Sequence, residues 1–237
     1  ARLGSDVHAI HVMDREADSY AILSTLDAST HSFVIRSFQD RVLADDEARL
    51  RTAAKAAKRS FEREVLLSRR PVIDGPKGKR HPARRERVAT LSVAARAVEI
   101  PRTSDAKAAA APTLRLNVVY VIERKPPPRE PAVEWFLLTN LPISTPDEIA
   151  FAVDCYRGRW TIEEYFKAIK TGCAYETLQL VSGSALIRAL AIFVPVAWRM
   201  LRLRWVERQR PETPATELLT PVQTQVLHAL AKRDGKP

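Results

Sequence analysis

The start of the chain alternates between strand-like and helix-like segments, and this order constrains the fold most strongly. Residues 7–13 (VHAIHVM) form a short apolar run that ends at Asp14. Residues 16–26 then place apolar side chains at helical spacing, and residues 32–37 (SFVIRS) form a second, β-branched run. A strand, a helix and a strand in this order are typical of a βαβ-like unit, because parallel strands need a long crossover. The start of the chain therefore predicts an α/β sheet.

The middle of the chain differs in composition. Residues 39–129 are rich in Arg, Lys, Pro and Ala, and helical spacing fades apart from a short run over residues 45–57. Prolines at 126–128 predict a loop, because proline cannot pair inside a sheet. Alternating apolar residues predict strands over residues 88–93, 114–122 and 135–138. We expect a mainly β insertion with a basic loop over residues 77–87, which either contacts a polyanion or is a solvated insertion.

The last third of the sequence has helical spacing. Pro146 and Asp147 begin a predicted helix that continues to Lys170, with Gly172 as its expected end. Two more helices are predicted over residues 184–209 and 220–231. The domain boundaries that we predict are 1–39 for a partial core, 40–140 for the insertion, 141–210 for the helical part of the core and 211–237 for the start of a carboxyl-terminal helical region.

The charge balance favours a polyanionic partner. Lys and Arg number 38 against 28 Asp and Glu, a net charge of +10, and nucleic acid is the commonest such partner. A hydrophobic content of 46% argues against global disorder. Two cysteines outside any C-x-x-C pair exclude a disulfide scaffold and a cysteine zinc finger, which favours a cytoplasmic location. Arginines interrupt the longest apolar run, residues 185–203, so we expect a buried or half-buried helix there and no membrane span.

One predicted helix carries a polar stripe. At about 100° per residue, five polar side chains between residues 156 and 170 fall within an arc of roughly 80°. They are Tyr156, Arg159, Glu163, Lys167 and Lys170, and the adjoining face holds Cys155, Ile162, Phe166 and Ile169, as a helix packed on a core requires. The simpler interpretation is a solvated face with ion pairs such as Glu163 with Lys167. One carboxylate among cations and a hydroxyl favours phosphodiester chemistry instead, because carboxylates bind divalent metals and cations hold phosphates.

Asp14 stands where the first predicted strand ends. In open α/β sheets, functional side chains gather at the carboxyl ends of strands. The alternative is that Asp14 caps the following helix. A metal site formed by His8, His11 and Asp14 is disfavoured, because strand residues three apart point to opposite faces.

Four segments carry a resemblance to a known family: DREAD after an apolar strand, FVIRS, WFLLTNLP and YRGRWTIEEYFKAIKTG. In this order they resemble bacterial insertion-sequence transposases of the DDE class, in the branch with the YREK signature. The resemblance implies an RNase H-like core with a mainly β insertion and a helical carboxyl-terminal part. Tyr156, Arg159, Glu163 and Lys167 match the letters of YREK, and Asp14 matches the second Asp of the catalytic triad.

The resemblance also implies roles for these residues. Asp14 and Glu163 would be catalytic ligands of two Mg²⁺ or Mn²⁺ ions. DNA would be held by Tyr156, Arg159, Lys167, Lys170 and Arg36, and a flipped base would stack on Trp135. A core aromatic is the alternative for Trp135. The implied partners are double-stranded transposon ends and a second copy of the chain in a synaptic complex, with neither a membrane nor a small-molecule substrate.

The family's first Asp lies on an earlier strand, whereas only thirteen residues precede Asp14. Asp6 belongs to the strand that leads to Asp14 and does not match it. We therefore expect an amino-terminally truncated fragment of a transposase that cuts and joins DNA, inactive alone. A non-catalytic DNA-binding remnant is the alternative, and a basic structural protein such as a ribosome-associated one would leave the Glu163 stripe unexplained.

Overall fold

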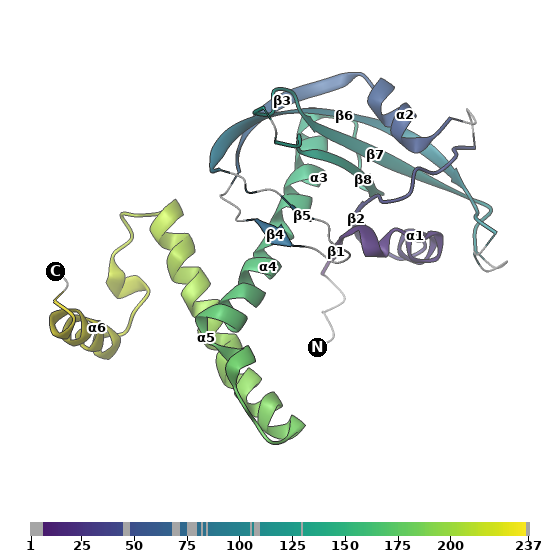
Figure 1. Ribbon diagram of the computed structural model, residues 1–237. Coiled ribbons are helices and arrows are strands. Elements are labelled where there is room, and N and C mark those ends of the chain that lie inside the picture. Colours follow the sequence, from purple (N-terminus) through teal and green to yellow (C-terminus); the bar gives the residue numbers. More distant parts are fainter. Residues whose placement is uncertain are drawn as a thin grey trace. The chain divides into compact units, whose positions relative to one another are not determined.

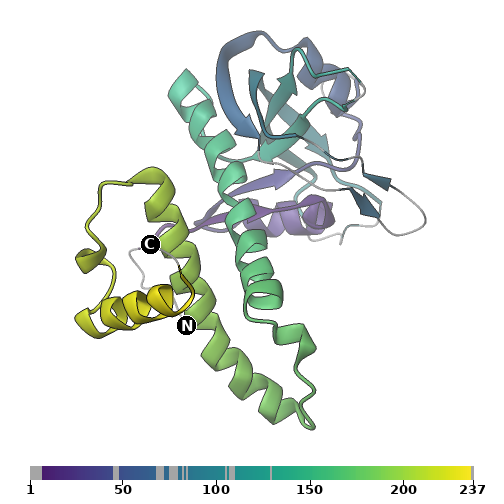
Figure 2. The same ribbon diagram turned by 60° about the vertical axis from the view of Figure 1, so that its left-hand side comes forward.

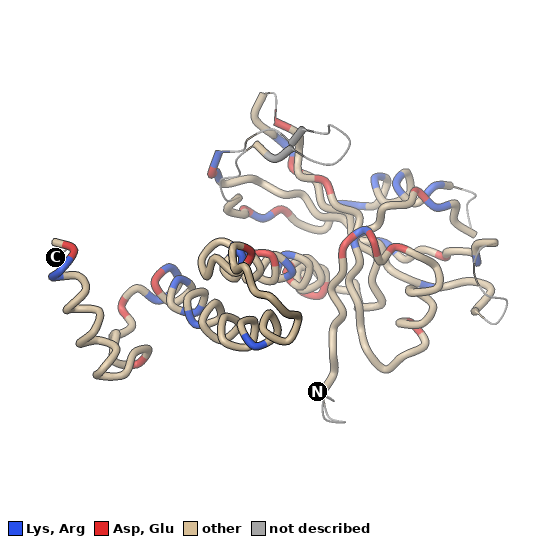
Figure 3. Tube along the Cα trace, turned by 60° about the horizontal axis from the view of Figure 1, so that its bottom comes forward, with Lys and Arg blue, Asp and Glu red and all other residues tan. Residues whose placement is uncertain are grey.

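The chain forms two compact units, residues 1–159 and residues 160–237 (Figure 1). The computed structural model describes residues 7–44, 48–67, 72–74, 80–81, 83, 85–104, 106, 110–128 and 130–235. Much of the predicted basic loop, including Lys77, Lys79 and Arg84, lies outside these residues. Figure 3 shows Lys and Arg along the described chain of both units.

The first unit is built on a mixed six-stranded sheet in the order β1-β2-β8-β7-β6-β3. β1 and β2 pair in parallel, and the other neighbours are antiparallel. The strands are β1 (Ile10–Met13), β2 (Ser32–Arg36), β3 (Arg59–Leu67), β6 (Arg87–Pro101), β7 (Thr113–Glu123) and β8 (Glu134–Thr139). The predicted α/β class is confirmed, and the predicted core and insertion segments contribute strands to one sheet.

Two caps shape the connection between β1 and β2. Asp14 caps the short 3-10 helix η1 (Arg15–Ala17), and Ser19 caps α1 (Tyr20–Asp27) by accepting a hydrogen bond from the Ile22 amide at 3.3 Å. The α-helix therefore begins four residues later than the apolar spacing predicts. A side-chain cap satisfies amide groups that would otherwise lack partners, and it fixes the residue at which a helix begins.

Two parts of the middle segment differ from the prediction. β3 follows the short helix α2 (Leu50–Ala56) and was not predicted. As an edge strand with four charged residues, β3 leaves most of one face in solvent and lacks a long apolar run. A small two-stranded sheet pairs β4 (Ile73–Asp74) with β5 (Arg80–His81).

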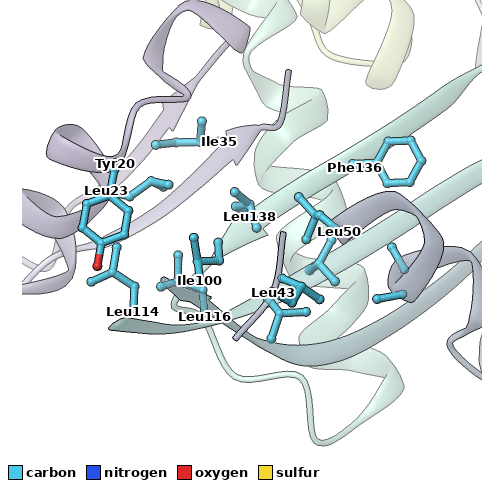
Figure 4. Close-up of a cluster of buried hydrophobic side chains, with 14 of the residues drawn as sticks. Tyr20, Leu23, Ile35, Leu43, Leu50, Ile100, Leu114, Leu116, Phe136 and Leu138 are labelled. Atoms are coloured by element: carbon cyan, nitrogen blue, oxygen red, sulfur yellow. The ribbon is translucent and has the colours of Figure 1, made fainter. Parts of the chain in front are cut away.

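Helices cover both faces of the large sheet. Side chains alternate along β2, so that Phe33 and Ile35 enter one hydrophobic cluster and Val34 enters the other. The first cluster packs α1 and α2 on the sheet, and Figure 4 shows its side chains. The second cluster packs α3 (Pro146–Gly158) on the opposite face (Figure 2). The carboxyl-terminal end of α3 is thereby fixed on the sheet.

The helix predicted to run without interruption to Lys170 is divided into three parts. It begins as predicted, with Pro146 in the first turn of α3 and a capping box formed by Thr145 and Glu148. α3 ends at Gly158, α4 covers Trp160–Lys167, and a π-helical turn, η3, covers Ala168–Gly172. The π-turn contains more residues than an α-turn, so Lys170 does not keep the angular position that an α-helix would give it.

The second unit is helical. After α4 and η3 it contains η4 (Tyr175–Thr177), α5 (Gly183–Gln209), η5 (Ala215–Glu217) and α6 (Pro221–Arg233). The prediction of a buried or half-buried helix over residues 185–203 is wrong for most side chains, since only Ala197 and Val206 of α5 are buried. Ile162 and Phe166 of α4 are also exposed rather than packed on a core. Few elements pack on these helices within the second unit, which leaves their apolar side chains in solvent. By length and composition alone, α5 could cross a bilayer.

Candidate functional site

Five of the predicted site residues come together at one end of the large sheet. Because β2 and β8 run antiparallel, the carboxyl end of β2 meets the amino end of β8, and Arg36 pairs in register with Leu137. β1 runs parallel to β2 and ends at the same edge. The end of α3 adds side chains from one sheet face. The residues brought together are Asp14, Arg36, Trp135, Tyr156 and Arg159, and we call them the sheet-end cluster.

The two carboxylate oxygens of Asp14 have different partners. Oδ1 accepts a hydrogen bond from the Arg15 amide at 2.7 Å, and Oδ2 lies 3.7 Å from Nη2 of Arg159. The Asp14 side chain is 41% exposed, whereas that of Arg159 is 14% exposed. Asp14 therefore caps η1, as the simpler interpretation predicts, and also presents a charged oxygen to the cluster.

Tyr156 forms the buried centre of the cluster. It is 1% exposed, and its hydroxyl lies beside the guanidinium group of Arg36. Burial raises the pKa of Tyr156, the nearby cations of Arg36 and Arg159 oppose this, and the charge of Asp14 reinforces it. The hydroxyl therefore stays protonated at neutral pH.

The remaining members surround the Tyr156 ring. The guanidinium carbon of Arg159 lies 5.8 Å from the ring centroid, within cation–π range. The indole of Trp135 meets the ring edge-on, with centroids 5.4 Å apart, and is half-buried at the border of the second hydrophobic cluster. Arg36 donates a hydrogen bond to the Glu134 carbonyl at 3.3 Å. Two guanidinium groups and one carboxylate thus lie close enough to Tyr156 to act on its hydroxyl.

Three predicted residues belong to the second unit. Glu163 and Lys167 are exposed on α4. Lys170 lies in η3, and its ammonium group is 3.0 Å from a carboxylate oxygen of Glu176. Both side chains of this ion pair are more than half exposed, so the pair contributes little to stability.

Asp18 organises the segment after β2 and was not among the predicted site residues. Its carboxylate is fully buried and forms an ion pair with Arg41 at 2.8 Å. It also accepts hydrogen bonds from the Ser37 hydroxyl and from the amides of Phe38 and Gln39. The second Asp of DREAD, four residues after Asp14, was the available signal. Asp18 holds the backbone that directly follows Arg36.

The family comparison agrees with this arrangement. A family model described as the transposase DDE domain matches residues 3–194 of the 237. The chain belongs to this family. The matched range contains every residue of the sheet-end cluster and the exposed polar residues of α4 and η3. This transposase domain is therefore expected to act on DNA, and its family generally uses divalent metal ions.

The acidic residues of this transposase domain fit a divalent metal only in part. Asp14 supplies the hard oxygen donor that Mg²⁺ and Mn²⁺ prefer. Within the described ranges, however, no three His, Cys, Asp or Glu side chains form a group that could hold a metal ion. The described residues therefore do not make up a complete ligand set.

Proposed function

We propose that the chain is a catalytic-core fragment of a YREK-branch insertion-sequence transposase that binds transposon ends at the sheet-end cluster. The observation that carries the proposal is the convergence of Arg36, Tyr156 and Arg159 beside Asp14. Arginine forks and hydroxyl donors are the groups that hold phosphate oxygens. In this proposal, residues 1–39 and 141–210 belong to an RNase H-like core and residues 40–140 to an insertion.

Each member of the cluster has its own part in the proposal. Arg159 holds a phosphate beside the scissile bond through its guanidinium fork, and Tyr156 donates its neutral hydroxyl to the same group. Arg36 holds the next phosphate of the DNA. Lys167 and Lys170 hold phosphates further along the same DNA strand. Trp135 stacks on a flipped base. In the complete enzyme, these contacts would hold the DNA for strand cleavage and strand transfer at transposon ends.

We propose Asp14 and Glu163 as two carboxylate ligands of the Mg²⁺ or Mn²⁺ ions of the complete enzyme. A third carboxylate is required in addition, because the described residues offer no complete ligand set. We therefore expect the chain alone to bind DNA without cutting it. A non-catalytic DNA-binding remnant of a transposase is the second candidate.

Salt dependence tests the DNA-binding part of the proposal. Each phosphate neutralised by a protein cation releases counterions, so the logarithm of affinity falls linearly with the logarithm of salt concentration. Arg159→Gln should weaken binding to a duplex oligonucleotide and reduce this slope by about one. Fluorescence anisotropy over a salt series measures both quantities.

Arg115→Gln is the matched control. Arg115 is 86% exposed and lies near the start of β7, at the opposite end of the sheet from Arg36. The slope of the logarithm of affinity against the logarithm of salt concentration should be the same in Arg115→Gln as in the wild type. An unchanged slope in Arg159→Gln, or equal losses in both variants, would show that Arg159 meets no phosphate.

Nicking of supercoiled plasmid tests whether the chain needs a third carboxylate, in addition to Asp14 and Glu163, to cut DNA with metal ions. With Mg²⁺ or Mn²⁺ added, the wild-type chain should bind the plasmid and leave it intact. Metal-dependent nicking that disappears in both Asp14→Asn and Glu163→Gln would contradict the need for a third carboxylate and make the chain an active enzyme.

A further inference from the structure

We infer that Phe38 is a stacking platform for an unpaired base of bound DNA, with Arg51 holding a phosphate of the same nucleotide. The inference rests on the proposed function, because it requires DNA at the end of the sheet where β2 stops. It adds a second aromatic side chain to the proposed interface, on the segment that directly follows Arg36. The ligand class is a nucleotide that has left the double-helical stack.

The backbone of Phe38 is held from both sides by charged groups. Its amide donates a hydrogen bond to Oδ2 of Asp18 at 2.7 Å, and its carbonyl accepts one from Nη2 of Arg51 at 2.9 Å. Asp18 is itself fixed by the buried ion pair with Arg41. The Ser37 hydroxyl, which donates to Asp18 or to the Gln39 carbonyl, closes the turn. The backbone of Phe38 is therefore fixed by hydrogen bonds to its amide and to its carbonyl.

The aromatic ring of Phe38 remains exposed to solvent. Phe38 is 61% exposed, although single exposed apolar residues are common on protein surfaces. The combination of an ordered backbone with an exposed ring is what distinguishes Phe38, since the network orders the segment without burying the aromatic surface. Trp135, by contrast, is half-buried with its indole against Tyr156. Of these two aromatic groups, Phe38 offers the greater open surface to a ligand.

Exposed cations lie beside the Phe38 segment. Arg51 and Lys55 are exposed on α2, and their charged groups lie 5.6 and 5.7 Å from the ring centroid of Phe136. The carbonyl of Phe136 accepts a hydrogen bond from the Ser37 amide at 2.7 Å, which ties that strand to the Phe38 segment. A guanidinium carries five N–H groups, so Arg51 can hold the Phe38 carbonyl and a phosphate together. An aromatic face next to such cations is how proteins bind unpaired nucleotides without sequence preference.

A gapped duplex tests this inference directly. The probes are a fully paired duplex and the same duplex with a short gap of unpaired thymines, and binding of the full-length chain to each is measured by anisotropy. Phe38→Ala should weaken binding to the gapped duplex by about tenfold, the order expected for one lost base stack, and leave binding to the paired duplex unchanged. Phe38→Trp should restore the wild-type affinity for the gapped duplex.

Phe151→Ala is the matched control, because Phe151 is 50% exposed on α3 and has no place in the proposal. It should bind both duplexes as the wild type does. Equal affinities of wild type and Phe38→Ala for the gapped duplex would overturn the inference while leaving the proposed function intact. A wild-type chain that binds neither duplex would overturn the proposed function and the inference with it. Thermal unfolding confirms that each variant is folded.

Discussion

The two oxygens of Asp14 separate a structural role from a chemical one. Oδ1 holds the Arg15 amide and thereby caps η1, while Oδ2 faces Arg159. An asparagine keeps an oxygen that can cap η1 and removes the negative charge. Asp14→Asn is therefore a better probe of the site than Asp14→Ala, because the alanine variant loses the cap as well.

Tyr120 makes stability depend on pH in the alkaline range. Its hydroxyl donates to Oε1 of Glu134 at 2.9 Å, and burial, followed by this hydrogen bond and the charge of Glu134, raises its pKa from 10.0 to about 12. Above pH 10 the unfolded chain releases this proton and the folded chain retains it. The free energy of unfolding therefore falls as the pH rises from 10.0 towards about 12.

Tyr120→Phe tests this prediction, because it removes the titrating group and keeps the ring that stacks on Phe136. Urea unfolding followed by circular dichroism at several pH values between 10.0 and about 12 gives the slope for each protein. The slope should be shallower in the variant than in the wild type. Identical slopes would mean that Tyr120 titrates alike in the folded and unfolded chains.

At the scale of elements, the Asp18–Arg41 pair joins η1 to the segment that follows β2. Both side chains are nearly inaccessible, at 0% and 4% exposure. Asp18→Ala leaves the Arg41 charge buried without its carboxylate, so we expect the free energy of unfolding to fall by about 3–5 kcal/mol. Urea unfolding measures this loss. Glu62→Gln, in the exposed pair with Arg59, should change stability by less than about 1 kcal/mol, and a similar small effect in Asp18→Ala would contradict the structural role.

Sequence patterns predicted elements where local spacing decides the structure. β2, β7 and β8 bury alternate or continuous apolar residues, and their positions agree with the prediction within a few residues. The polar edge strand β3 was missed, because half of its side chains face water. The break after Gly158 and the π-turn of η3 were missed as well, because helical spacing alone assumes an uninterrupted α-helix.

At the scale of the whole molecule, the candidate site depends on contacts between distant segments. Asp14 and Arg159 are separated by most of the first unit in sequence and lie 3.7 Å apart in space. No local pattern predicts this contact, and only the family's order of motifs pointed to it. Asp18 escaped prediction for a related reason. Its partners follow β2, and an acidic residue before a helix is most simply interpreted as a cap.

The helices of the second unit expose apolar side chains, and this bears on the second copy of the chain that the family resemblance implies. On α5, Ile187 is 69% exposed and Trp198 is 59% exposed, and their spacing places them on the same helix face. On α6, Val222 is 67% exposed. Exposed apolar surface of this kind marks an interaction site. Although α5 is long enough to span a bilayer, its arginines, including Arg188 and Arg199, would be costly in lipid, so we propose a second copy of the chain as the partner.

Sedimentation equilibrium should therefore show a dimer that dissociates on dilution. The double variant Ile187→Glu, Trp198→Glu places two negative charges on the proposed contact face. It should shift the equilibrium towards the monomer. Leu66→Glu is the control, because Leu66 is 64% exposed on β3 in the first unit and should leave the dimer unchanged. A wild-type chain that is monomeric at every concentration, or that floats with lipid vesicles, would contradict the proposal. In the second case the apolar face of α5 would be assigned to a membrane, because lipid would compete for the surface that the second copy is proposed to cover.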